Sequence, residues 1–149
     1  DVFVQVIAAL KKQLPDIKAM LVGDGEDREH IEAMIQDLSL DENIIITGSI
    51  PHNESLKMMQ RAKILLHPSS YEGFGTVCIE ALYAGAHVIS FVKPMHREIK
   101  NWNIVTTTED MQDKTLEIVT NSETIYEPVL IYSADDAAKK IMQLVGFLK

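Results

Sequence analysis

Two glutamates flank a glycine-containing loop near the middle of the sequence. Glu72 and Glu80 are separated by seven residues, and Gly73 and Gly75 lie between them. Carboxylates accept hydrogen bonds from hydroxyl groups, and glycine lets backbone N–H groups approach a bound anion closely. The pattern therefore indicates a site for a ligand that combines an anionic group with hydroxyls.

The elements expected around this loop place both glutamates at one pocket. Apolar runs at residues 63–67 and 87–92 predict two buried strands. Between them, a helix that is apolar on nearly all sides is expected to begin near Thr76 and to end at Gly85. Glu80 is the ionisable exception in this helix, and a buried carboxylate needs a partner. Because helical side chains lean toward the helix N-terminus, the Glu80 carboxylate should face the loop, about 6 Å away.

The unpaired N–H groups of residues 73–77 would form the floor of this pocket, at the positive end of the helix dipole. Such a floor favours a phosphate or a diphosphate. Carboxylates would repel that group, so they fit the pocket only as acceptors for neutral donors beside it, such as sugar hydroxyls. A nucleotide sugar carries a sugar on each side of a diphosphate. On this hypothesis Glu80 binds one sugar, the loop binds the diphosphate and Glu72 binds the other sugar.

Two other hypotheses stay open for the same residues. The pocket could bind a nucleotide or a sugar without catalysis, because a glycine loop that enters a helix is common in α/β proteins. Alternatively, Cys78 in the first turn of the helix could be the nucleophile of a hydrolase, with His67, His87 or His96 as its base. The apolar neighbours of Cys78 favour core packing instead, and cysteine chemistry leaves Glu80 unexplained.

Composition and charge narrow the class of protein. The chain has 149 residues, of which 46% are hydrophobic and 24% charged, which predicts one globular domain over residues 1–149. No apolar run approaches the length of a membrane span, and no signal peptide is visible. The net charge of −8 argues against a nucleic-acid partner. A single cysteine excludes an internal disulfide and fits a reducing compartment.

Strand-like and helix-like segments alternate along the chain. This alternation predicts a three-layer, Rossmann-like α/β domain with a mostly parallel sheet of about five or six strands. Thr107 and Asp110 have the spacing of a helix capping box. The segments expected as strands are residues 17–22, 43–47, 63–67, 87–92 and 103–106, and residues 129–132 are expected to form another extended run.

The stretch PSSYEGFGTVCIEALYAG at residues 68–85 resembles the signature of GT-B glycosyltransferases, specifically the retaining glycosyltransferase family 4, also called group 1. LVGDG at residues 21–25 and ITGSI at residues 46–50 are similar to other landmarks of that family, in the expected order. The resemblance covers residues 2–92 well and the remainder loosely. It implies that Glu80 binds the ribose hydroxyls of the donor and that Glu72 contacts the donor sugar as the catalytic residue. The residues that it implies around the sugar and the diphosphate are Gly73, Phe74, Gly75, Thr76 and Val77.

The resemblance also implies roles for two further loops. Ser49, Ile50 and His52 would lie near the nucleotide base, in a loop at the carboxyl end of a predicted strand, where α/β proteins bind ligands. After the strand at residues 87–92, family members have a Gly-Gly loop and a glutamate, whereas this chain has a different sequence at residues 93–98. Lys93 in that segment, together with Arg97, could neutralise phosphate charge.

At the scale of the whole enzyme, the resemblance implies half of a GT-B fold. The sequence opens without a methionine, directly in an amphipathic helix, and we expect it to be one domain of a longer two-domain chain. A missing N-terminal domain would bind a glycan, lipid-linked or small-molecule acceptor. The enzyme would transfer a sugar from the nucleotide diphosphate sugar with no metal or other cofactor, and the isolated domain should be inactive. We expect a cytoplasmic protein, or one held peripherally at the inner face of the membrane.

Overall fold

The chain folds into alternating helices and parallel strands. The computed structural model describes residues 1–71, 75–93, 98–131 and 133–144. Within these residues the elements, in order, are α1 (Val2–Lys11), β1 (Ala19–Val22), α2 (Arg28–Asp37), β2 (Ile44–Gly48), α3 (His52–Arg61), β3 (Ile64–His67), α4 (Thr76–Tyr83), β4 (His87–Ser90), β5 (Trp102–Ile104), α5 (Thr108–Thr120) and α6 (Ala134–Leu144).

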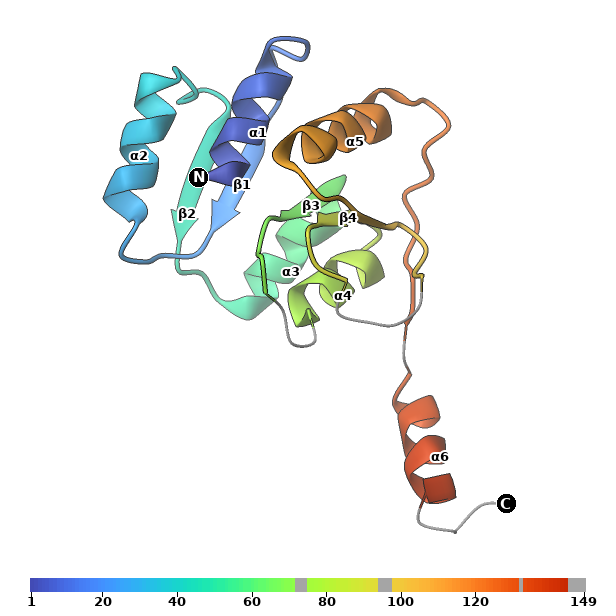
Figure 1. Cartoon of the computed structure of the whole chain (residues 1–149). Coiled ribbons are helices and arrows are strands. Elements are labelled where there is room, and N and C mark those ends of the chain that lie inside the picture. The colour runs from blue at the N-terminus through green and yellow to red at the C-terminus, as the bar shows by residue number, and fades with distance from the viewer. Residues whose placement is uncertain (72–74, 94–97, 132, 145–149) are drawn as a thin grey trace.

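The five strands form two parallel sheets (Figure 1). β1 pairs with β2 in one sheet, and the other sheet has the order β3-β4-β5. The predicted α/β class and the parallel pairing are confirmed, but the single sheet that we expected is divided. Among the described residues, β1, β2, β3 and β5 are each paired along only one edge, and β4 is paired along both.

Side chains that alternate along β4 divide the core into two layers. Ile89 joins an apolar cluster with buried residues of α1 and α5, whereas Val88 joins a second cluster with Trp102 and the buried residues of α4. Successive strand side chains point to opposite faces, so helices cover both faces of this sheet. Figure 1 shows α1 and α5 on one side of it and α4 on the other. The three-layer arrangement is thereby confirmed for the β3-β4-β5 sheet.

Two helices begin where β2 and β3 end. β2 leads through residues 49–51 into α3, and β3 leads through a longer loop into α4. The N-cap of α4 is Gly75, which has φ 67° and ψ 45°, a left-handed conformation that favours glycine. α4 begins at Thr76, as predicted, and Gly85, with φ 96°, follows its last turn. α3 and α4 pack against each other, and His52 at the start of α3 contacts Glu80 in the middle of α4.

The C-terminal part of the chain leaves the body of the protein. After α5 an extended segment leads to α6, which stands apart from the other helices in Figure 1. The exposed side chains of α6 include Ile141 and Leu144. Among the described residues, no helix combines the length and the apolar character needed to cross a membrane.

Candidate functional site

His52 and Glu80 form the polar centre of the candidate site. His52 is the first residue of α3, and Glu80 lies in the middle of α4. The imidazole Nε2 of His52 is 3.0 Å from Oε1 of Glu80. Because an ionised carboxylate can only accept hydrogen bonds, Nε2 is the donor in this contact. The structure therefore brings together two residues that are 28 positions apart in the sequence.

Glu80 lies at the boundary between the core and the solvent. Its neighbours Cys78, Ala81 and Leu82 are buried, while 27% of the Glu80 side chain is exposed. The apolar surroundings make a partner necessary, and His52 is that partner. The other carboxylate oxygen, Oε2, accepts no hydrogen bond from the residues that the structure describes. One oxygen of Glu80 thus has a protein partner, and the other can accept a hydrogen bond from a ligand.

The other predicted site residues lie near the start of these helices. Ser49 is exposed and Ile50 half-buried in the loop that leads to His52. Thr76 is exposed and Val77 half-buried in the first turn of α4, and no side chain caps this helix within the described part of the chain. In this first turn the N–H of Cys78 donates to the carbonyl oxygen of Gly75, which leaves the N–H groups of Thr76 and Val77 for a ligand.

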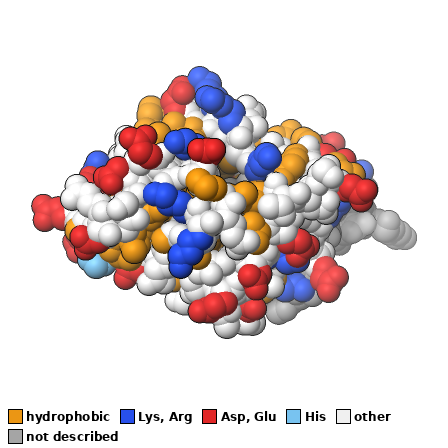
Figure 2. Space-filling view, turned by 90° about the horizontal axis from the view of Figure 1, so that it is seen from above, with side chains coloured by type: hydrophobic (Ala, Val, Ile, Leu, Met, Phe, Trp, Pro, Cys, Tyr) orange, Lys and Arg blue, Asp and Glu red, His pale blue; other side chains and the backbone are white. Residues whose placement is uncertain are grey.

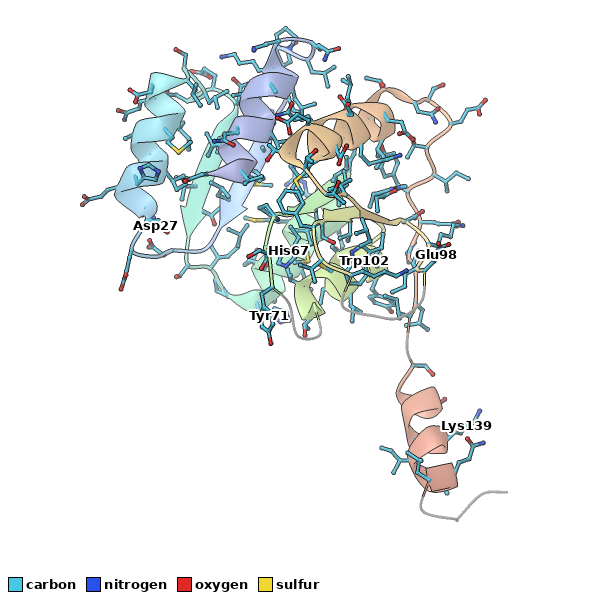
Figure 3. The ribbon with its side chains drawn as sticks, viewed as in Figure 1. Asp27, His67, Tyr71, Glu98, Trp102 and Lys139 are labelled. Atoms are coloured by element: carbon cyan, nitrogen blue, oxygen red, sulfur yellow. The ribbon has the colours of Figure 1, made fainter. Side chains whose placement is uncertain are left out.

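Several predicted residues cannot be placed. Glu72, Gly73 and Phe74 lie outside the described residues, as do His96 and Arg97. The described ends of the loop before α4 are Tyr71 and Gly75, and Figure 3 shows Tyr71 exposed beyond His67 at the end of β3. The roles of Glu72, Gly73, Phe74, His96 and Arg97 stay predictions from the sequence.

Lys93 follows a backbone segment that two consecutive hydrogen bonds hold in place. The indole Nε1 of Trp102 donates to Oγ of Ser90 over 2.9 Å, and Ser90 Oγ donates to the carbonyl oxygen of Val92 over 2.8 Å. Ser90 and Trp102 are buried, whereas Lys93 is exposed. This network holds the backbone immediately before Lys93. The sequence did not single out Ser90 or Trp102, because neither residue belongs to a motif.

Arg28 is a cation near the carboxyl end of β2, and no motif in the sequence marks it as a site residue. Its Nη1 is 3.3 Å from the position that a Cβ atom at Gly48 would occupy. Nε of Arg28 donates to Glu32 over 2.7 Å, and Nη1 lies 3.4 Å from Asp24. The hydrogen bond to Glu32 and the charges of Glu32 and Asp24 raise the pKa of Arg28 above its ordinary value. Asp24 and Glu32 therefore already balance the charge of Arg28. The signal for these two ion pairs was present in the sequence, since each carboxylate lies four residues from Arg28.

The buried thiol bears on the hydrolase hypothesis. Cys78 has no solvent-exposed surface. A nucleophile must reach its substrate, so the burial of Cys78 supports the core-packing interpretation. Among the described residues, no three histidine, cysteine, aspartate or glutamate side chains form a group that could hold a metal ion.

Surface charge is mixed on the face that Figure 2 shows. Acidic and basic side chains are interspersed there with apolar ones, and neither sign forms a continuous patch on this face. Nucleic-acid binding requires a concentrated basic surface, and this face does not present one.

Comparison with known proteins extends these observations. The family model for glycosyl transferases group 1 matches residues 1–124. The chain is 36% identical over 90 residues to the phosphatidylinositol N-acetylglucosaminyltransferase gpi3 subunit of Schizosaccharomyces pombe, which covers 60% of this chain and 20% of the relative. It is 33% identical over 88 residues to a 2-deoxystreptamine glucosyltransferase of Streptomyces kanamyceticus, which covers 59% of this chain and 23% of the relative. The chain thus spans about a fifth of the length of these relatives.

Solved structures show the same fold. A variant of TarM from S. aureus, in complex with fondaparinux, alpha-GlcNAc-glycerol and UDP, is 25% identical with a TM-score of 0.76, over 96% of this chain and 29% of that one. The C-terminal domain of the group 1 glycosyl transferase LpcC from Francisella tularensis is 23% identical with a TM-score of 0.74, over 85% of this chain and 71% of that one. The family match covers most of the chain and agrees with the fold. The chain belongs to the glycosyl transferases group 1 family.

Proposed function

We propose that this domain binds the nucleotide diphosphate sugar donor of a retaining glycosyltransferase of family 4. The observation that carries the proposal is the position of Glu80. Its carboxylate lies on α4, a helix that follows β3 at the carboxyl end of the strand, and Oε2 has no partner among the described residues. Ligands of α/β domains bind beyond the carboxyl ends of the strands, where a carboxylate can accept hydrogen bonds from ribose hydroxyls.

The diphosphate belongs, in this proposal, at the N-terminal end of α4. The first-turn N–H groups point out of the helix and carry its positive dipole end, which stabilises an anion. Gly73 and Gly75 let the phosphates approach the backbone, and the exposed Lys93 adds positive charge. Catalysis would then consist of holding the donor in place and stabilising the departing diphosphate, with Glu72 at the donor sugar.

The proposed reaction moves the sugar to an acceptor hydroxyl and needs no bound metal. Two relatives are named for a lipid, phosphatidylinositol, and for a small molecule, 2-deoxystreptamine, which supports an equally broad choice of acceptor for this protein. The UDP in the TarM complex supports a nucleotide-sugar donor. We further propose that this chain belongs to the C-terminal, donor-binding domain of the enzyme and that the acceptor binds a preceding domain. The enzyme would work in the cytoplasm or at the inner face of the membrane.

Calorimetric titration with UDP, GDP and ADP tests the donor site. We expect one nucleotide to bind saturably, and we expect Glu80→Ala to weaken its binding by roughly tenfold or more, because a hydrogen bond to a charged group is lost. Glu117→Ala is the matched control, since Glu117 is a glutamate on α5 that pairs with Lys114. Equal affinities of the wild-type protein and Glu80→Ala would contradict the proposal, as would failure of all three nucleotides to bind.

A further inference from the structure

The hydrogen bond between His52 and Glu80 restricts the Glu80 side chain before any ligand binds. Glu80 is held from one side only: Nε2 of His52 donates to Oε1, and the described residues provide no donor to Oε2. A glutamate side chain has several rotatable bonds, and fixing them before a ligand arrives removes an entropic cost from binding. The hydrogen bond therefore preorganises the carboxylate.

We propose that His52 is a positioning residue for Glu80, which it orients so that Oε2 faces the hydroxyls of the bound nucleotide. This inference rests on the proposed donor site and adds to it a residue that acts through Glu80. The alternative is that His52 contacts the nucleotide itself, since 69% of its side chain is exposed. The two roles differ in whether the effect of His52 depends on Glu80.

The positions of the two residues favour the first role. His52 begins α3, and the packing of α3 against α4 fixes the separation of the two backbones. The hydrogen bond to Glu80 requires a proton on Nε2 of His52. The charged imidazole and one tautomer of the neutral imidazole both carry this proton. A side-chain amide on α3 can donate in the same way, so a glutamine should replace the histidine.

A double-mutant cycle on nucleotide affinity tests the inference. The nucleotide is whichever of UDP, GDP and ADP binds the wild-type protein, and the variants are His52→Ala, His52→Gln, Glu80→Ala and His52→Ala with Glu80→Ala. We expect His52→Ala to weaken binding roughly two- to tenfold, which is the effect of releasing one ordered side chain. His52→Gln should restore most of the affinity, and His52→Ala should have no further effect once Glu80 is alanine.

Controls separate this inference from the proposed function and from misfolding. His87→Gln serves as the matched histidine variant, because Nε2 of His87 bonds the carbonyl oxygen of Ile125 at the opposite, amino end of β4. Denaturant unfolding of each variant checks that the fold is retained. An undiminished effect of His52→Ala in the Glu80→Ala protein would show direct ligand contact and overturn the inference, while the donor site itself would stand. Absence of nucleotide binding by the wild-type protein would overturn both.

Discussion

The Glu80 carboxylate lies between apolar neighbours and solvent, and two kinds of contact replace part of its lost hydration. His52 donates to one oxygen, and the exposed quarter of the side chain meets solvent. An exposed pair of this kind contributes little to stability, on the order of 0–1 kcal/mol. Because the pair contributes so little to stability, the fold alone does not explain a carboxylate at this position, which agrees with the role in ligand binding that we propose for Glu80.

The burial of Cys78 leads to a prediction about thiol reactivity. Iodoacetamide should modify the folded protein very slowly and should modify it rapidly once denaturant unfolds the chain, because the thiol is inaccessible in the native state. Mass spectrometry of the alkylated protein measures the rate. Fast modification of the native protein, at the rate of a free thiol, would contradict the packing and revive the hydrolase hypothesis.

The sequence identified both members of the central pair but not their contact. Glu80 stood out because its neighbours are apolar, and His52 because of the family resemblance. Their hydrogen bond depends on how α3 packs against α4, which no local pattern encodes. The same holds for Ser90 and Trp102, whose hydrogen bond is made across neighbouring strands of the sheet.

At the scale of elements, the capping box at the start of α5 is confirmed and gives a prediction about pH. The Asp110 backbone N–H donates to Oγ1 of Thr107, and Oδ2 of Asp110 accepts from the backbone N–H of Thr107. Hydrogen bonds from the side chain of Thr106, and then from Thr107, lower the pKa of Asp110 below its ordinary value.

A lowered pKa in the folded state means that the ionised form stabilises the protein. This contribution is complete above the carboxyl pKa of the unfolded chain, about 4, and disappears as pH falls through the lower folded-state pKa. Asp110→Asn should therefore destabilise the protein near pH 7, and its difference from wild type should shrink below about pH 4. Denaturant unfolding across this pH range measures the effect, with Asp113→Asn, an exposed aspartate of the same helix, as the control. A difference that stays constant with pH would contradict the role of the carboxylate.

Helix positions could be predicted well from local chemistry. The glycine before Thr76 and the capping box before α5 mark helix starts by mechanisms that act within a few residues. α3 shows the limit of this reasoning, because Asn53 is a residue type that favours the N-cap position and yet lies inside the helix. Pro51 is the N-cap, with φ −58° and ψ 144°, and the helix begins at His52.

At the scale of the whole molecule, each face of β2 has a different environment. Ile44 belongs to the core cluster beneath α1 and α2 and is 5% exposed, whereas Ile45 on the opposite face is 61% exposed. Ile44→Ala should cost about 2–5 kcal/mol of unfolding free energy through the loss of burial and the cavity that it leaves. Ile45→Ala should cost less than about 1 kcal/mol. Denaturant unfolding of the two variants compares them directly, and equal losses would mean that both faces of β2 are covered in solution.

The alternation of strand-like and helix-like segments predicted the α/β class, but it did not predict that the strands divide into two sheets. Apolar runs such as residues 17–22 and 63–67 indicate strands without stating which edges pair. Pairing is decided by long-range packing, and here only β4 is paired along both edges among the described strands. The exposed side chains of Met20, Val22 and Ile45 belong to the same β1-β2 sheet.

The most direct test of the account is the position of a bound nucleoside diphosphate. A crystal structure of the protein with the nucleotide that calorimetry selects should show a ribose hydroxyl within hydrogen-bond distance of the Glu80 carboxylate. The same structure should show the phosphates at the N-terminal end of α4. A nucleotide bound elsewhere, for example in the hollow lined by Arg28 and Glu32, would contradict the account and return Glu80 to a structural role.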